Sequence, residues 1–118
     1  MENIDWADLL FKFDGRINRA KFWIGIIAIQ VVVWIFVGLA AVLDSSFMWA
    51  MVGLLTLLII WPGLAISIKR WHDRDKSGWW IFIAWVPLIG ALWALIETGF
   101  LPGTPGTNRY GPDPLTGV

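Results

Sequence analysis

The chain has 118 residues, of which 58% are hydrophobic and 15% are charged, and ten are tryptophan. This composition lies outside the range of ordinary soluble domains and indicates a single integral membrane domain, residues 1–118. The formal net charge is zero, so no overall positive field favours a nucleic-acid partner. The sequence contains no cysteine, which excludes disulfides, thiolate metal ligands and thiol nucleophiles.

Residues 1–21 are polar with interspersed apolar side chains, and we expect a short interfacial helix in this flank. Asn3 and Asp5 are the candidate caps of the helix, and the Asp14–Gly15 turn ends it. Basic side chains follow the turn, just before the first apolar run. Each of them can gain roughly 1 kcal/mol from the phosphates of an anionic leaflet.

Two apolar runs, residues 22–43 and 47–68, follow the flank, with only three residues between them. As helices that rise 1.5 Å per residue, each is roughly 33 Å long, which is enough to cross a hydrocarbon core of about 30 Å. The short connection predicts an antiparallel pair of transmembrane helices. Pro62 removes a backbone hydrogen bond from the second helix, so we expect a bend there.

A third apolar run, residues 79–101, predicts a third transmembrane helix capped by Ser77. A proline and a glycine interrupt this run, so a re-entrant hairpin folded at residues 87–90 is the alternative. Each half of such a hairpin would have about 9 to 11 residues, too few to span the membrane without shielding by protein. We therefore favour the full crossing, followed by a turn-rich tail, residues 102–118, that holds four of the six prolines.

The densest cluster of charges, residues 69–78, lies between the second and third runs. Each Lys, Arg or Asp at bilayer depth costs roughly 2.5 to 3.5 kcal/mol, so this loop must lie in water or among headgroups. The amino-terminal flank and the loop hold four Lys or Arg each, the connection 44–46 holds none, and the tail holds one. By the positive-inside rule the amino terminus and the loop are cytoplasmic, and the tail after a third span lies outside.

Three motifs are more specific than composition: residues 13–19, residues 69–74 with 77–80, and residues 103–114. Together they resemble the bacterial inner-membrane family catalogued as domain of unknown function 805, over about residues 10–114. The resemblance implies a small multi-pass protein of the inner (plasma) membrane. It implies no activity, because none is established for the family.

His72 and Asp75 are the one place to seek a general base or metal ligand, because residues three apart share a helix face. One His with one or two carboxylates lacks the ligands of a metal centre, so we assign no catalytic, cofactor-binding or metal-binding residue. We expect Asp73 to form ion pairs with Lys69 and Arg70 instead. The candidate residues for binding a lipid headgroup or a partner protein are Arg16, Arg19, Lys69, Arg70, His72, Asp73, Arg74 and Lys76.

Gln30 and Glu97 are the candidate polar residues inside the membrane, where such groups are functional hypotheses by default. We expect Glu97 near the outer interface, about 10 Å from the middle of the third run. Gln30 either makes an interhelical hydrogen bond or lines a pore. Small residues suited to packing within one chain or in a homo-oligomer are Gly63 and Ser67, and Gly90, Ala94 and Thr98. The candidates for docking the tail are Asn108, Arg109 and Tyr110, and the alternative is a disordered tail.

The fold class that follows is an all-α membrane protein with three transmembrane helices, a short interfacial helix and an irregular tail. Our leading hypothesis is a non-enzymatic membrane component without a cofactor. Its expected partners are membrane phospholipid and either a second copy or another membrane protein. One alternative is a subunit of a small oligomeric transporter or channel, with Gln30 and Glu97 lining the path. The third hypothesis is an enzyme that acts on lipid.

Overall fold

The computed structural model describes residues 4–115, and every regular element in this range is a helix. The predicted all-α class is therefore confirmed. The elements are α1 (Trp6–Phe11), α2 (Arg19–Leu43), α3 (Ser46–Leu58), α4 (Ile60–Asp73), the 3₁₀ helix η1 (Gly78–Trp85), α5 (Ile89–Leu95) and the π-helix η2 (Ile96–Phe100).

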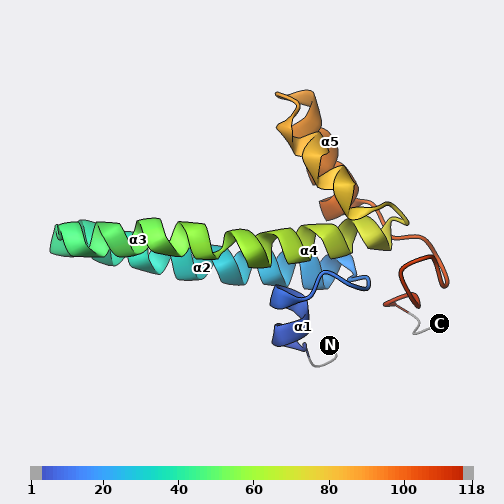
Figure 1. Cartoon of the computed structure of the whole chain (residues 1–118), viewed down its shortest axis with the longest axis horizontal. Helices are drawn as coiled ribbons and strands as arrows, with labels where there is room; N and C mark the ends of the chain where they lie inside the picture. The colour runs from blue at the N-terminus through green and yellow to red at the C-terminus, as the bar shows by residue number, and fades with distance from the viewer. Residues whose placement is uncertain (1–3, 116–118) are drawn as a thin grey trace.

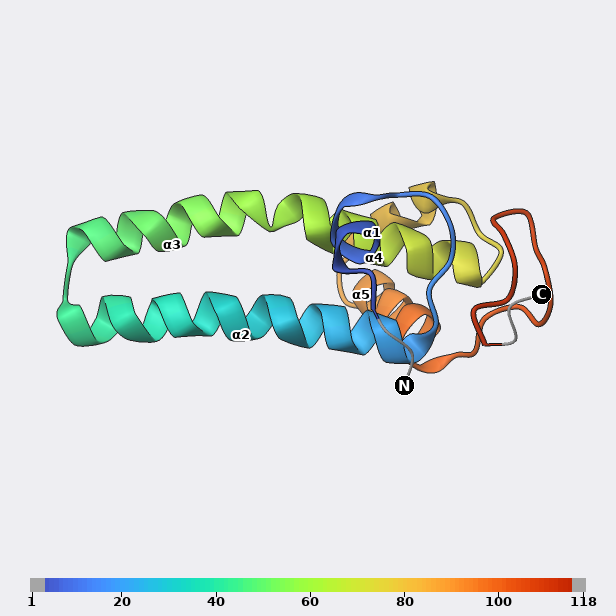
Figure 2. The same ribbon diagram turned by 90° about the horizontal axis from the view of Figure 1, so that it is seen from below.

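α2 runs antiparallel to α3 and α4, and together they form a long helical hairpin (Figures 1 and 2). Asn18 caps α2, because its side chain accepts a hydrogen bond from the Lys21 amide at 2.8 Å. At the other end of α2, Asp44 turns the chain with a positive φ of 49°. The Ser45 hydroxyl then caps α3. The antiparallel pair expected from the first two apolar runs is confirmed.

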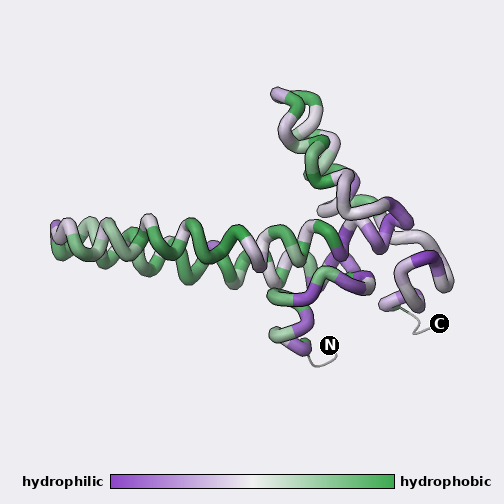
Figure 3. The backbone as a smooth tube through the Cα atoms, viewed as in Figure 1, coloured by the Kyte–Doolittle hydropathy of each residue, from purple (hydrophilic) through white to green (hydrophobic). Residues whose placement is uncertain are grey.

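The two arms of the hairpin, Arg19–Leu43 and the stretch Ser46–Asp73, are each long and apolar enough to cross a membrane. Only 6% and 11% of their most apolar stretches are buried, so their side chains face outward rather than into a protein core. Figure 3 shows apolar residues along the whole hairpin and polar residues gathered at the end that carries both termini. This distribution suits two membrane spans with one polar, water-facing end.

The helix is interrupted between α3 and α4, at Ile59. Pro62 has no amide hydrogen, so it cannot donate to the carbonyl four residues earlier. The next donor, the Gly63 amide, bonds the Ile59 carbonyl at 2.9 Å and restores the helical pattern. The irregularity therefore lies in the turn that ends at Pro62.

The run 79–101 forms η1, α5 and η2 rather than one helix, so the expected third transmembrane helix is not confirmed. η1 leads away from the hairpin, the chain reverses around Leu88, and α5 with η2 returns beside η1 (Figure 1). Leu88 has a positive φ of 62° at the reversal. A Cβ atom on Gly90 would lie 1.8 Å from the Ile83 carbonyl oxygen, so only glycine permits so close a return. We call residues 78–100 the crosspiece.

The small apolar core lies where α1 meets the hairpin. Its buried residues are Leu9, Ile17, Phe22 and Ile66. The expected short amino-terminal helix is present as α1, and Asp5 caps it by accepting a hydrogen bond from the Asp8 amide at 3.2 Å. Asn3, the other candidate cap, lies outside the described residues. α1 and the crosspiece leave the hairpin on different sides but near the same end (Figure 1).

Candidate functional site

Most charged side chains of the three sequence motifs meet at the end of the hairpin that carries both termini. We call this cluster the polar junction, and it comprises residues 14–19, residues 69–77, Glu97 and the tail residues 102–113. Figure 3 shows it as the polar region around the end of α4. The fold-back of the crosspiece is what brings the tail to this place.

Asp73, at the end of α4, is the centre of the polar junction. Its Oδ1 accepts a hydrogen bond from Arg16 Nε at 2.9 Å, and its Oδ2 accepts one from Arg70. Only 1% of the Arg16 side chain, none of Arg70 and 4% of Asp73 is exposed. The expected ion pair of Asp73 with Arg70 is confirmed, and Arg16 is a second partner. Two guanidinium groups thus replace the water that the buried carboxylate has lost.

The tail binds to Asp73 mainly through backbone groups. The Thr104 amide donates to the Asp73 carbonyl at 2.7 Å, and Arg16 donates to the Thr104 carbonyl at 2.6 Å. A Cβ atom on Gly103 would lie 2.0 Å from Asp73 Oδ2, so the close approach requires glycine. These contacts bring the tail beside the charged loop, whereas a full third crossing separates the two.

Lys69 connects α1 to α4 and does not form the expected ion pair with Asp73. Its fully buried ammonium donates to the carbonyls of Asp8 and Leu9, at 2.8 Å for Leu9. The side chain leaves α4 on the side where α1 packs, which explains the different partner. Lys69 and Arg70 have no exposed surface, so neither is accessible to a lipid headgroup in this structure.

Glu97 lies in the polar junction, and its expected position near the outer interface is wrong. Its carboxylate lies 2.5 Å from Lys76 Nζ and 3.5 Å from Arg74 Nε. Trp93 Nε1 donates to the other carboxylate oxygen at 2.8 Å. The return of α5 and η2 toward the hairpin brings Glu97 to the charged loop. It is therefore a paired carboxylate rather than an isolated acid within a span.

His72 forms a stacked pair with Tyr110 of the tail, with ring centroids 3.9 Å apart and planes inclined by 2°. Its Nδ1 lies 2.9 Å from the Gly15 carbonyl oxygen. A carbonyl oxygen can only accept, so Nδ1 must carry the proton of this hydrogen bond. Gly15 has a φ of 90°, in the left-handed region that favours glycine. All three sequence motifs therefore meet around this imidazole.

Asp75 does not join His72 but pairs with Arg109. Arg109 Nε lies 3.2 Å from Asp75 Oδ1, and its Nη2 donates to the Asp75 carbonyl at 2.7 Å. Asn108 donates to the His72 carbonyl at 2.9 Å, so each of the three tail candidates contacts the charged loop. Among residues 4–115, no group of three His, Asp or Glu side chains is placed to share a metal ion.

The basic side chains that remain accessible lie at the edge of the polar junction. Arg19 is exposed, although its Nη1 donates to the Phe100 carbonyl at 2.8 Å. Arg74 and Lys76 keep 24% and 29% of their side chains exposed beside Glu97. Lys12, which is exposed before the Asp14–Gly15 turn, adds another cation. These residues can therefore contact lipid headgroups, whereas the buried basic side chains cannot.

Asp113 closes part of the tail into a compact loop. Its carboxylate accepts hydrogen bonds from the Leu115 amide at 2.9 Å and from the Gly106 amide at 3.0 Å. These two backbone donors favour the charged form and lower the pKa of the Asp113 carboxyl below its ordinary value of 3.8. The loop is thereby stabilised most when this carboxyl is ionised.

Gln30 lies far from this cluster, on the exposed surface of α2. It is eleven residues beyond Arg19, about 17 Å along the helix axis. The two candidate residues inside the membrane, Gln30 and Glu97, therefore do not face a common path within one chain.

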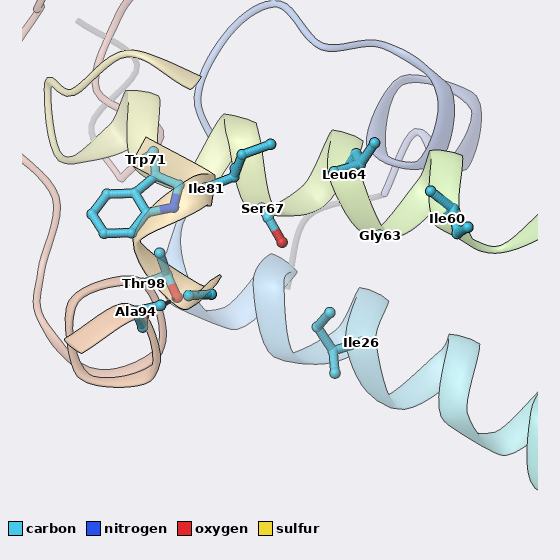
Figure 4. Close-up of a pocket in the computed structure, with 10 residues that line it drawn as sticks. Ile26, Ile60, Gly63, Leu64, Ser67, Trp71, Ile81, Ala94 and Thr98 are labelled. Carbon is cyan, nitrogen blue, oxygen red and sulfur yellow. Dashed lines mark hydrogen bonds between the residues drawn. The ribbon is translucent and has the colours of Figure 1, made fainter. Parts of the chain in front are cut away.

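Small residues of both groups, although not Gly90, line a cavity of about 370 Å³ between α2, α4 and the crosspiece. Figure 4 shows Gly63 and Ser67 of α4 on one side and Ala94 and Thr98 on the other. The Thr98 hydroxyl is already bonded to the Ala94 carbonyl at 2.6 Å. A Cβ atom on Gly63 would meet nothing within 4 Å, so this glycine is not required for a close helix contact within one chain.

Two tryptophans have contacts that local sequence does not indicate. Trp23 Nε1 donates to the Gly99 carbonyl at 2.8 Å, and Trp61 Nε1 donates to the Phe11 carbonyl at 2.9 Å. A Cβ atom on Gly99 would lie 2.8 Å from the Trp23 ring. The sequence assigns both tryptophans to the membrane and carries no signal for these distant carbonyls.

Comparison with known proteins identifies the family. The model of a family described as "Protein of unknown function (DUF805)" matches residues 10–112. The chain belongs to this family. It is 35% identical over 122 residues to Inner membrane protein YhaH of Escherichia coli strain K12, covering 94% of this chain and 97% of YhaH. The resemblance drawn from the three motifs is therefore confirmed.

Two further proteins of the same strain are similar to this chain. Inner membrane protein YhaI is 36% identical over 107 residues, covering 89% of this chain and 87% of YhaI. Uncharacterized protein YiiR is 35% identical over 131 residues, covering 88% of this chain and 86% of YiiR. No solved structure matches the chain.

Proposed function

We propose that this DUF805 protein is a two-span, non-enzymatic protein of the bacterial inner membrane that binds anionic phospholipid of the cytoplasmic leaflet. The names of YhaH and YhaI and the two apolar arms of the hairpin support the location. The basic flank and loop support a cytoplasmic polar junction, by the positive-inside rule. Because the tail bonds to that loop, both termini are then cytoplasmic.

The observation that carries this proposal is the exposed apolar surface of the crosspiece beside the polar junction. Trp79, Trp85 and Leu88 are 77%, 78% and 84% exposed. In water each 100 Å² of such surface costs about 2.5 kcal/mol. At the boundary between headgroups and acyl chains the same surface is favourable, and tryptophan is enriched there. The crosspiece therefore suits the cytoplasmic interface, next to the membrane-facing end of the junction.

Accessible cations near this interface supply the preference for anionic lipid. Lys12 and Arg19 are exposed, and Arg74 and Lys76 are partly exposed. Each basic side chain near an anionic leaflet contributes about 1 kcal/mol, and the attraction weakens with salt.

The test uses site-directed spin labelling, which the cysteine-free sequence allows without background. A nitroxide on the Leu88→Cys variant should be accessible to oxygen and protected from a water-soluble nickel chelate. Val31→Cys on α2 is the control for the hydrocarbon, and Thr107→Cys in the tail is the control for water. A Leu88 label that behaves like the Thr107 label rejects the interfacial crosspiece.

The side of the tail is tested separately, with paired reporters fused after Val118. A reporter that is active only in the cytoplasm should work, and one that is active only outside should not. The opposite result would restore the full third crossing and reject the two-span topology.

A second copy is the further partner that we propose to test. Gln30 presents an exposed amide in the middle of an apolar helix, and such groups favour interhelical hydrogen bonds. Replacing Gln30 by leucine should reduce any oligomer detected by light scattering in detergent. An unchanged oligomeric state would reject Gln30 as the contact.

A further inference from the structure

A second cavity, of about 410 Å³, opens between the amino-terminal flank, α4, η1 and the tail. Leu64, Ile68 and His72 follow one another at intervals of four residues and line one strip of α4, about 12 Å long. Aromatic rings from three other segments form much of the remaining wall, and they are Phe13, Trp79, Phe82 and Tyr110. We call this cavity the aromatic groove.

The aromatic groove has one apolar end and one polar end. Leu64 lies toward the apolar middle of the hairpin, whereas His72 and Tyr110 lie at the polar junction. Gly78 allows η1 to approach this closely, because a Cβ atom there would lie 2.9 Å from the Ile68 side chain. In the proposed topology the groove therefore runs from acyl-chain depth to headgroup depth.

Two polar atoms at the polar end are without partners in the described chain. The hydrogen bond to Gly15 fixes the proton on His72 Nδ1, which leaves Nε2 as an acceptor when the ring is neutral. No hydrogen bond among residues 4–115 involves Nε2 or the Tyr110 hydroxyl. Every buried side-chain nitrogen or oxygen in this range has a hydrogen-bond partner. Nε2 and the Tyr110 hydroxyl have none, so both atoms must be accessible from outside the protein. An acceptor and a hydroxyl are thus carried by two stacked rings that both line the groove.

The groove has no charged side chain other than the titratable His72 among its lining residues. A phosphate or carboxylate would need a cation or several donors there, and Arg109, the nearby cation, pairs with Asp75 and is not among the lining residues. An uncharged polar end suits the groove better, because a hydroxyl can donate to His72 Nε2 and accept from Tyr110.

We propose that the aromatic groove binds an uncharged lipid that ends in a hydroxyl group, with its chain along Leu64 and Ile68. The proposal rests on the two-span topology, which brings the groove to the membrane interface. Acylglycerols and quinols are two lipid classes that present such an end, and they share the hydrogen-bond chemistry described above.

The test uses the full-length protein in nanodiscs and a monoacylglycerol that carries a diazirine in its acyl chain. Cross-links should map to the groove residues Phe13, Trp79 or Phe82. Unlabelled monoolein and decylubiquinol are the two competing probes, and the one that displaces the label at lower concentration identifies the lipid class. Phosphatidylglycerol is the charged competitor and should displace the groove label least.

Tyr110→Phe is the decisive variant, because it removes only the hydroxyl and keeps the ring stacked on His72. Loss of one hydrogen bond should weaken cross-linking about five- to tenfold without changing the unfolding temperature. His72→Asn, whose amide can keep the bond to Gly15 but not the Nε2 acceptor, should weaken it as well.

Cross-links spread evenly along α2 and α3, or unchanged by Tyr110→Phe, would overturn the groove as a site. Equal displacement by phosphatidylglycerol would overturn its preference for an uncharged lipid. A tail reporter active only outside would instead reject the topology, so the two proposals fail by different measurements.

Discussion

The two ends of the helical hairpin are stabilised by different kinds of interaction. At the far end, α2 and α3 pack through apolar side chains, and a Cβ atom on Gly38 or Gly53 would meet nothing within 4 Å. At the polar junction, Gly103 is enclosed so tightly that a Cβ atom would clash with Asp73, and in the adjoining crosspiece Gly90 is enclosed as tightly by Ile83. The far end tolerates many sequences that are apolar enough for lipid. The junction requires particular residues, because ion pairs and backbone contacts are made over long sequence separations.

The largest effect expected from this contrast is that of Asp73→Ala. The variant leaves Arg16 and Arg70 buried with no carboxylate between them, and breaking such a pair costs about 3 to 5 kcal/mol. Thermal unfolding in mild detergent measures the loss. Asp44→Asn is the matched control at the far end, where an exposed residue with positive φ accepts asparagine at a cost below about 0.5 kcal/mol. Equal losses in the two variants would contradict the comparison.

Gly90→Ala should have the next largest effect. The added methyl group would overlap the Ile83 carbonyl, and overpacking of this kind costs about 1 to 3 kcal/mol. Limited proteolysis of the crosspiece and thermal unfolding both report the change. Gly38→Ala is the control, since it adds the same methyl group in open space and alanine favours a helix by about 1 kcal/mol over glycine. A destabilising Gly38→Ala with a neutral Gly90→Ala would reverse the expected order.

Glu97→Gln should cost less, about 1 kcal/mol, because Arg74 and Lys76 keep some access to water. The same variant addresses the transporter hypothesis. If Glu97 is structural, any ion flux measured in liposomes should be unaffected once the amount of folded protein is matched. Glu97→Asp, which keeps the charge on a shorter side chain, is the control for the ion pair. Loss of flux in a fully stable Glu97→Gln protein would favour the transport role.

Much of the fold follows from hydropathy and local signals. The hairpin, its Asn18 and Ser45 caps and the interruption before Pro62 all depend on residues near one another in sequence. The fold of the crosspiece does not follow from these signals, because a segment of its length can form either a transmembrane span or a folded hairpin. What decides between them is the reversal at Leu88 together with the bonds that the returning chain makes to Arg70 and Trp23. Hydropathy does not detect such bonds.

The candidate site was predicted as a set of residues, and within it the sequence predicted only the ion pair of Asp73 with Arg70 correctly. The motifs identified Arg16, Asp73 and Arg109 as special, and the structure brings the tail and loop together. Two expectations were wrong for the same reason. The Lys69 partner and the depth of Glu97 both depend on which segments pack against α4, and sequence spacing within one helix carries no information about a distant segment.

The smallest expected effect is a pH dependence confined to the tail. The pKa of the Asp113 carboxyl in the folded tail lies below its ordinary value of 3.8. The ionised carboxylate therefore stabilises the folded tail fully at pH values above 3.8, and this stabilisation is lost as the pH falls through the lowered pKa. Hydrogen exchange at the Gly106 and Leu115 amides should therefore show weaker protection in acid, after correction for the pH dependence of the chemical exchange rate. Asp113→Asn should remove most of this dependence, because an amide cannot ionise. The α2 amides near Gln30 are the internal control, since no carboxylate caps them. If they lose protection in parallel with the tail, the transition is global unfolding, and the two ends of the molecule are coupled more tightly than their contacts imply.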